Sequence, residues 1–383
     1  MKLFKSLLIA PATLGLLAPF TAVASEVDFK AISKYSNSEY EIDSNSFKYL
    51  STNNTLVSGG EGLVESDSPD SFSTTTSASF SVEAVLGTAS AEDRSLLTDD
   101  GEYNVEGTSF EYQYQIGLTS SFTGEDSLDV TIDVGGAGGT RGTSITNVFH
   151  GFDATADAME VDGITYTFPV GGMTMLVGDS TDVSAVYTGA CAYSGFSDYM
   201  GDCGTGNSIG LGGAGATVAA SYAFDSGFSL AGGLTSPNIE ILGEDSVDGY
   251  GLELAYTQDG YGLSLAYSDV ETSTFVGLNG FYSFDFATVS AGYETQDVED
   301  DGGEGSAFFV GLTKEIGAGT AELGYGSTDL DFGFGAPDET GYIYEASYAY
   351  PVNDYLTITP GLAIVDLNDA ETTFAAVKAS FAF

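Results

Sequence analysis

Carboxylates recur at alternate positions within short segments whose intervening positions are apolar. Glu253 stands between Leu252 and Leu254, and Asp129 and Asp133 alternate with aliphatic side chains in the same way. Seven acids follow this pattern: Glu111, Asp129, Asp133, Glu253, Glu294, Glu322 and Glu345. Alternate side chains of an extended chain share one face, so each acid would lie opposite an apolar face. Carboxylates that line a pore attract cations and repel anions.

The alternative is that each acid is merely solvated and is neutralised locally by Arg141, Lys314 or Lys378. The whole chain has only 9 Lys and Arg against 56 Asp and Glu, a net charge of −47, so the cations are too few for the set. The same imbalance argues against nucleic acid as a partner, because an acidic chain repels phosphate backbones.

Neither catalysis nor metal binding is indicated. A nucleophile needs a base nearby, and the sole histidine, His150, lies in an expected external connection without a convincing triad. We therefore expect no enzyme. Cys191 and Cys203 fall short of four zinc ligands, and we expect no metal and no cofactor. Because residues 1–24 predict export, as described below, we expect the two cysteines to form a local disulfide instead.

The two cysteines lie within residues 180–213, the longest stretch without a clear strand pattern. A loop closed by a disulfide can fold into the lumen of a barrel and narrow it. The candidates for such a constriction are Tyr193, Asp198, Tyr199 and Asp202. An external cap is the other interpretation, and the sequence leaves both open.

The elements that would position these side chains are β-strands. Residues 373–383 alternate apolar with small or polar side chains and end on Phe383, a pattern typical of the closing strand of an outer-membrane barrel. From residue 77 onward, segments of roughly eight to twelve residues recur between turn signals, the length of a tilted membrane-spanning strand. We predict sixteen strands, at 77–87, 108–122, 127–134, 158–168, 172–179, 214–224, 228–234, 249–257, 261–268, 274–284, 287–295, 305–314, 319–327, 341–350, 354–364 and 373–383.

The connections alternate in length. Counted back from Phe383, residues 365–372 form a long connection, 351–353 a short one and 327–340 a long one. Short periplasmic turns that alternate with long external loops are typical of outer-membrane barrels, whereas a soluble sandwich has no reason to segregate them. We therefore expect an all-β fold, a transmembrane antiparallel β-barrel of about 16 strands with long acidic external loops.

Aromatic side chains bracket an aliphatic centre on one face of the expected strands. In residues 250–256, Tyr, Leu, Leu and Tyr alternate with Gly, Glu and Ala, and residues 261–267 repeat the order. An aromatic girdle around a hydrocarbon band faces lipid. The other face carries Gly, Ala, Ser and Thr, which are too small to fill a sixteen-stranded barrel, so we expect a water channel.

The N-terminal part differs from the rest. Residues 1–24 combine a basic start, an apolar stretch and a small-residue cleavage site, which predicts a secretory signal peptide. Residues 25–76 are acidic and rich in Ser, which predicts a flexible periplasmic lead-in before a barrel at 77–383. The expected location is the outer membrane.

Five segments carry a resemblance to a known family: residues 1–4, 31–36, 72–76, 122–128 and 166–171. In order and spacing they resemble cyanobacterial outer-membrane porins, which are related to the carbohydrate-selective porin family and are also labelled iron-uptake porins. The resemblance implies passive diffusion of small hydrophilic solutes and cations, with sugars or iron as candidates. It also suggests a homotrimer in outer-membrane lipid.

That family usually carries a surface-layer-homology domain and a coiled coil before the barrel, which anchor it to peptidoglycan. This chain has only the acidic, Ser-rich residues 37–71 there, which puts peptidoglycan anchoring in doubt. The sequence thus predicts a porin with a weak preference for cations. The alternative is a structural or adhesive outer-membrane barrel without an open pore.

Overall fold

The computed structural model describes residues 76–91, 107–138, 149–199, 201–211, 214–237, 241, 248–270, 273–298, 303–329, 340–367 and 370–383. The predicted signal peptide (1–24), nearly all of the predicted lead-in (25–76) and Arg141 lie outside these residues. Among the described residues, no helix is long and apolar enough to cross a membrane.

The described chain forms sixteen strands. The first eight are β1 (Thr76–Ala91), β2 (Gly107–Ser120), β3 (Ser127–Gly135), β4 (Glu160–Val170), β5 (Met173–Thr181), β6 (Gly215–Ala223), β7 (Phe228–Ser236) and β8 (Gly249–Gln258). The second eight are β9 (Tyr261–Asp269), β10 (Ser273–Phe284), β11 (Ala287–Val298), β12 (Gly303–Ile316), β13 (Gly319–Thr328), β14 (Gly341–Asn353), β15 (Leu356–Leu367) and β16 (Ala370–Ala382). Each predicted strand overlaps one of these in order.

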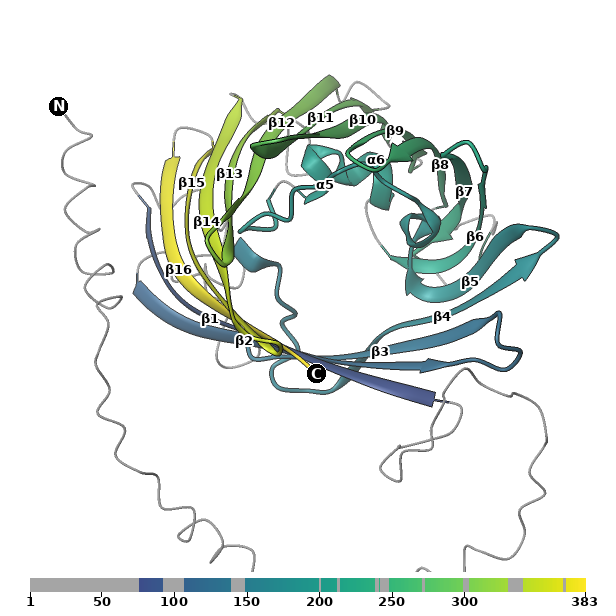
Figure 1. Ribbon diagram of the computed structural model, residues 1–383, viewed down its shortest axis with the longest axis horizontal. Helices are drawn as coiled ribbons and strands as arrows, with labels where there is room; N and C mark the ends of the chain where they lie inside the picture. The colour runs from purple at the N-terminus through teal and green to yellow at the C-terminus, as the bar shows by residue number, and fades with distance from the viewer. Residues whose placement is uncertain are drawn as a thin grey trace, which may run out of the picture. The chain divides into compact units, whose positions relative to one another are not determined.

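The strands close into one antiparallel barrel in which every strand pairs with its neighbours in sequence and β16 pairs with β1 (Figure 1). At the seam, Phe80 and Phe383 exchange backbone hydrogen bonds of 2.9 and 3.0 Å. Closure leaves no free sheet edge, which satisfies the backbone groups of a strand that faces lipid. The predicted barrel of about 16 antiparallel strands is therefore confirmed.

The outer surface of the barrel carries the apolar members of each alternating pair. Tyr250, Leu252 and Leu254 on β8 are about half exposed, whereas Glu253 between them is 1% exposed. Large aliphatic and aromatic side chains stay this exposed only where the surroundings are themselves apolar, as on the outside of a membrane barrel.

One expected connection is much shorter than predicted. Residues 365–372 were expected to form a long loop, but β15 continues to Leu367 and β16 begins at Ala370. Asp366 pairs with Glu371 across the hairpin. The polar sequence indicated a loop, but longer strands pair more backbone groups, so the prediction of a long connection here is wrong.

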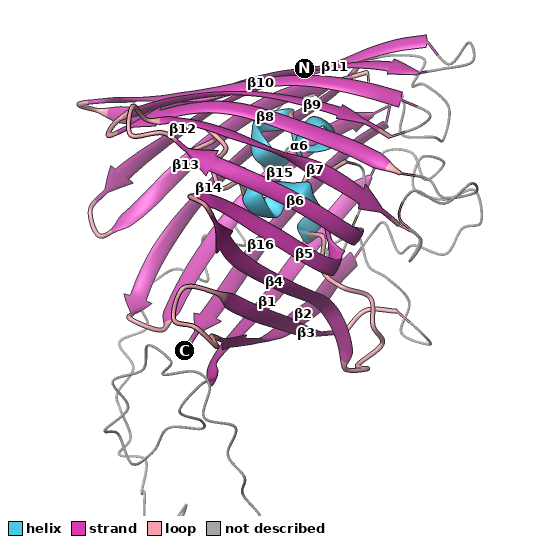
Figure 2. Ribbon diagram, turned by 90° about the vertical axis from the view of Figure 1, so that its right-hand side faces the viewer, coloured by secondary structure: helices cyan, strands magenta, loops and turns pink. Residues whose placement is uncertain are grey.

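The connection from β5 to β6 is described at residues 182–199, 201–211 and 214. These residues lie inside the barrel, and we call them the inner loop. It contains the short helices η4 (Val183–Val186), α5 (Gly201–Gly204) and α6 (Gly206–Gly210). Both α5 and α6 lie within the ring of strands in Figure 1 and behind the near wall in Figure 2. The loop contacts the inner faces of β6, β7 and β9 to β12, so it is not an external cap.

Candidate functional site

Four glutamates on the barrel wall hold the inner loop by accepting hydrogen bonds: Glu253 on β8, Glu294 on β11, Glu322 on β13 and Glu345 on β14. Glu253 accepts from the backbone N–H groups of Thr188 and Gly189, at 2.7 and 2.8 Å. Glu294 accepts from the backbone N–H of Ser208 at 2.6 Å and from the side-chain amide of Asn207 at 2.8 Å. These acids thus bind main-chain groups of the loop.

Glu345 makes the largest set of these contacts. It accepts the hydroxyl of Tyr193 at 2.7 Å, the backbone N–H of Phe196 at 3.2 Å, and the backbone N–H and hydroxyl of Ser197 at 3.1 and 2.7 Å. Hydrogen bonds to an ionised acceptor are stronger than those between neutral groups. One carboxylate therefore holds Phe196 and Ser197, the first two residues of 196–199, which we call the turn of the inner loop.

The predicted channel-lining acids face the inside of the barrel, but most of them have little solvent exposure. Six of the seven are at most 8% exposed: Glu111, Asp133, Glu253, Glu294, Glu322 and Glu345. The seventh, Asp129, is half-buried and accepts the hydroxyls of Thr119 and Ser127, each at 2.6 Å. Where the acids bind loop donors, their negative charge is compensated there instead of being offered to ions.

Inward-facing glycines make room for the loop. A Cβ on Gly292 would overlap the backbone of Cys203, one on Gly311 would lie 2.5 Å from the ring of Tyr193, and one on Gly361 would lie 2.4 Å from the ring of Phe196. Gly251, Gly277 and Gly324 meet the loop in the same way. The small inward side chains were expected to leave open water. At these positions the loop occupies that space.

Substitution of Gly292 with valine is expected to displace the inner loop, because the new side chain would overlap the backbone of Cys203. Overpacking of this kind costs about 1–3 kcal/mol. The matched control is Ala291→Val on the same strand, whose side chain points outward. Thermal unfolding of both variants checks the prediction. Equal melting temperatures would show that the glycine is not required for loop packing.

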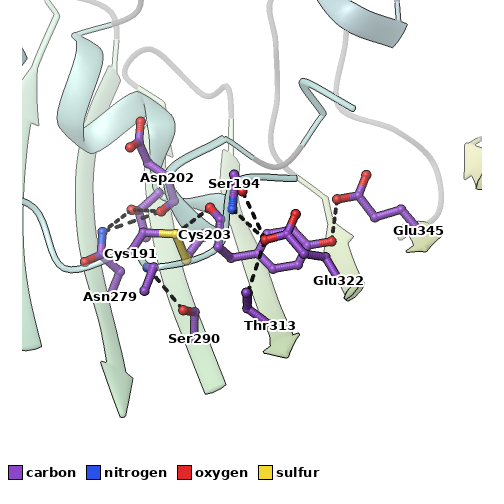
Figure 3. The surroundings of a disulfide bond; sticks show 12 residues. Cys191, Ser194, Asp202, Cys203, Asn279, Ser290, Thr313, Glu322 and Glu345 are labelled. Carbon is purple, nitrogen blue, oxygen red and sulfur yellow. Dashed lines mark hydrogen bonds between the residues drawn. A yellow bond between two sulfur atoms is a disulfide. The ribbon is translucent and has the colours of Figure 1, made fainter. Parts of the chain in front are cut away.

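The predicted disulfide is confirmed. Cys191 and Cys203 are joined, with their Cα atoms 5.8 Å apart (Figure 3). Cys203 is buried beside Tyr193 and Phe309. Ser194, which follows the first cysteine closely, donates its backbone N–H and its hydroxyl to Glu322 at 3.3 and 3.0 Å. The disulfide therefore closes a segment that the wall already holds.

Loss of the disulfide through Cys191→Ser and Cys203→Ser is expected to increase the mobility of residues 191–203. Closing a loop of this length stabilises a fold by about 3 kcal/mol. We expect faster hydrogen exchange at residues 192–199 and unchanged exchange at 188–189, which Glu253 holds. If residues 192–199 exchanged equally fast in the variant and in the native chain, the disulfide would not have this role.

The four constriction candidates fall into two groups. Tyr193 is buried against the wall, and Tyr199 is half-buried. Asp198 and Asp202 are exposed, so they are the acids of the loop that meet the lumen. Partial desolvation raises the pKa of the Asp198 carboxyl, an effect that Lys378 opposes. Desolvation, with neighbouring acids, also raises the pKa of Asp202.

Lys378 on β16 forms an ion pair with Glu83 on β1, with 3.6 Å between nitrogen and oxygen. Lys314 is exposed and lies near the end of β12. Lys378 was one of the cations considered for local neutralisation of the seven predicted acids. Its ion-pair partner, Glu83, lies on the inner wall but is not one of those seven. Among the described residues, no group of three or more His, Cys, Asp or Glu could hold a metal ion.

Sequence reasoning missed two sets of residues that shape the lumen. The first is the set of inward glycines under the loop. The second is residues 149–152, from the connection between β3 and β4, whose rings contact the turn of the inner loop. The first set carried a signal, because Gly and Glu share the inward face two residues apart at Gly251 and Glu253 and at Gly292 and Glu294.

No protein-family model matches this chain, and no curated protein sequence does. Solved structures are similar to it. A mutant of Rh. blastica porin aligns with a TM-score of 0.52 and 16% identity, covering 80% of this chain and 100% of that one. An anion-selective porin from Comamonas acidovorans aligns with a TM-score of 0.55 and 13% identity, covering 81% and 99%. A loop-deletion mutant of OmpT, an outer membrane protein of Vibrio cholerae, aligns with a TM-score of 0.55 and 12% identity, covering 81% and 100%.

At these identities the similarity establishes the architecture. The chain has the closed sixteen-strand antiparallel barrel of bacterial porins. Since one of these neighbours is described as anion-selective, the fold by itself does not determine which ions such a barrel prefers.

Proposed function

We propose that the chain forms an outer-membrane channel for passive diffusion of small hydrophilic solutes and ions. The observation that carries the proposal is the combination of a closed barrel with an apolar outer face and an inner loop bound along part of the wall. A cavity of about 390 Å³ beside the inner faces of β1, β2, β15 and β16 supports it, with a lining that includes Ser81, Gln113, Gln115, Thr357 and Ser380. Phe152, Leu356 and Phe381 also line the cavity, and its polar side chains suit hydrated solutes.

The proposed channel prefers cations weakly. Asp198 and Asp202 are exposed on the inner loop, whereas Glu253, Glu294 and Glu345 are hydrogen-bonded beneath it. Exposed carboxylates raise the local concentration of cations. Sugars and iron enter the proposal only through the resemblance to cyanobacterial porins, and none of the contacts among the described residues selects either.

The proposal includes export by a signal peptide at residues 1–24, a periplasmic lead-in at 25–76 and insertion of the barrel in outer-membrane lipid. The aromatic side chains at both ends of the outer face, such as Tyr250 and Tyr256, support the lipid environment. A homotrimer is proposed from the resemblance alone. No enzymatic activity is proposed.

A second candidate function is a structural or adhesive barrel without an open pore. The close packing of the inner loop favours it, because Phe196 and Tyr193 fill the space over wall glycines. A lumen filled by aromatic side chains would not conduct ions. The two functions therefore differ in one measurable property, which is conductance.

Planar-bilayer recording of the refolded chain under a potassium chloride gradient tests the proposal. We expect discrete conductance steps, and we expect the sign of the reversal potential to show a preference for cations. Silence from a folded, heat-modifiable barrel would overturn the channel and leave the structural barrel. Steps with anion preference would retain the channel and contradict the role of Asp198 and Asp202.

A further inference from the structure

Residues from a second connection contact the inner loop inside the barrel. Phe149 lies between β3 and β4 in sequence and is only 1% exposed. Its ring stacks on Phe374 of β16, with centroids 4.4 Å apart and planes 18° apart, and contacts Tyr199 at 5.3 Å. A residue of one connection thus bridges the barrel wall and the turn of the other.

His150 adds a second set of ring contacts. Its ring lies 5.2 Å from Phe196 in an edge arrangement and 5.5 Å from Phe374. It also stacks on Phe152 at 5.5 Å. The three phenylalanines that His150 contacts belong to one buried cluster that includes Val85 of β1 and Ala363 of β15, so the contact extends over several strands of the wall. Aromatic pairs at such distances contribute beyond the apolar area that they bury.

The backbones also meet at this point. The N–H of Asp198 donates to the carbonyl oxygen of Phe149 at 2.9 Å. Gly151 has a φ of +59°, and a Cβ there would lie 2.5 Å from the Asp198 carboxylate. A left-handed backbone without a side chain is therefore needed for the close approach of the two connections.

These contacts add to those of Glu345 and include two further residues of the turn, Asp198 and Tyr199. Glu345 accepts hydrogen bonds from Phe196 and Ser197 of the turn. Phe149 accepts the backbone N–H of Asp198, and its ring contacts the ring of Tyr199. A turn held only at Phe196 and Ser197 can still pivot about that contact, whereas a turn also held at Asp198 and Tyr199 is restricted to one position.

We propose that Phe149 and His150 are positioning residues that fix the turn of the inner loop, so that two connections rather than one set the width of the lumen. The consequence for conduction rests on the proposed channel function. The positioning role itself does not, because it concerns contacts that exist whether or not ions pass. The exposed Asp198 carboxylate owes its place in the lumen to this arrangement.

The chemistry of His150 suits an aromatic cluster. Burial, together with the charge of Lys378, lowers the pKa of the imidazole to about 3, while a hydrogen bond with the backbone of Phe196 acts in the opposite direction. The ring is therefore neutral near pH 7 and can pack against Phe152, Phe196 and Phe374 without burying an unpaired charge.

Hydrogen exchange of the refolded barrel tests the positioning role. In Phe149→Ala we expect the amides of residues 196–198 to exchange at least about tenfold faster than in the native chain, because local opening no longer breaks the ring contacts. The amides of Thr188 and Gly189, which Glu253 holds at the other end of the loop, should not change. They serve as an internal reference in the same molecule.

His150→Ala is the second variant, since it removes a ring while leaving Phe149 in place, and we expect an intermediate increase. Phe122→Ala is the matched control, because it removes an exposed ring in the turn between β2 and β3. Heat-modifiable migration on gels shows which variants form the barrel. Unchanged exchange at 196–198 in a folded Phe149→Ala or His150→Ala barrel would overturn the inference.

Single-channel conductance separates this inference from the proposed function. Faster exchange with a conductance rise of roughly 1.5-fold would support both. Faster exchange in a barrel that is silent with and without the substitution would support the positioning role and overturn the channel. Unchanged exchange in a barrel that conducts would keep the channel and remove these residues from the control of its width.

Discussion

Replacement of Glu345 with alanine is expected to raise the single-channel conductance roughly twofold, because it releases the turn of the inner loop from the wall. Four donors lose their acceptor at once: the hydroxyls of Tyr193 and Ser197 and the backbone N–H groups of Phe196 and Ser197. Unpaired donors of this kind cost about 3 kcal/mol together, which is enough to populate detached conformations of the turn. Bilayer recording measures the conductance directly.

Glu315→Ala is the matched control for this variant. It removes a glutamate from the same barrel, but Glu315 is exposed and accepts a hydrogen bond from Thr320, which belongs to the wall. Its conductance should equal that of the native chain. Glu345→Gln should fall between the two, since it keeps an acceptor oxygen without the charge. A Glu345→Ala barrel with native conductance would show that the carboxylate does not set the width of the lumen.

The double substitution of Asp198 and Asp202 with asparagine is expected to lower the ratio of potassium to chloride permeability by roughly threefold, with little change in conductance. These are exposed acids of the inner loop, and asparagine has nearly the same size. The reversal potential in a potassium chloride gradient measures the ratio. The control is Asp259→Asn with Asp285→Asn, which removes two charges from exposed turns outside the lumen.

Acidification should have the same effect on the native chain. Desolvation raises the pKa of Asp198 and Asp202 above the usual 3.8, so both carboxyls lose their charge at a higher pH than an exposed aspartate. The cation preference should therefore decrease as the pH falls through these raised pKa values. The double variant should lack this part of the titration. A native chain and a double variant with the same reversal potential across the titration would remove both aspartates from ion selection.

The barrel could be predicted from sequence because each strand carries its own signal. Alternation with a period of two assigns each residue of β8 to the inner or the outer face, and Tyr250 and Tyr256 mark the two ends of the apolar stretch on the outer face. The end of β15 and the start of β16 were harder to predict, because the paired residues there, Asp366 and Glu371, are polar. Strand ends outside the apolar band carry no pattern that separates them from a loop.

The state of the inward acids could not be predicted from the same alternation. The sequence pattern of glycine and glutamate on an inward face is the same whether water or a loop covers that face. The distinction depends on donors that lie far away in the sequence, such as Thr188 and Gly189 for Glu253. The contacts of Phe149 were out of reach for the same reason, because the ring of Phe374 is distant in the chain and the connection between β3 and β4 has no periodic pattern.

Burial of the inner loop depends on strands that lie far from it in the sequence. All four glutamates that hold it belong to strands that follow it, and Ser197 precedes its acceptor Glu345 by 148 residues. The hydrogen bonds that hold the loop can therefore form only where β8, β11, β13 and β14 lie beside it. Contacts of such long range slow folding, since the chain loses entropy before it gains them. Burial of the inner loop is thus coupled to the formation of the strands that supply its acceptors.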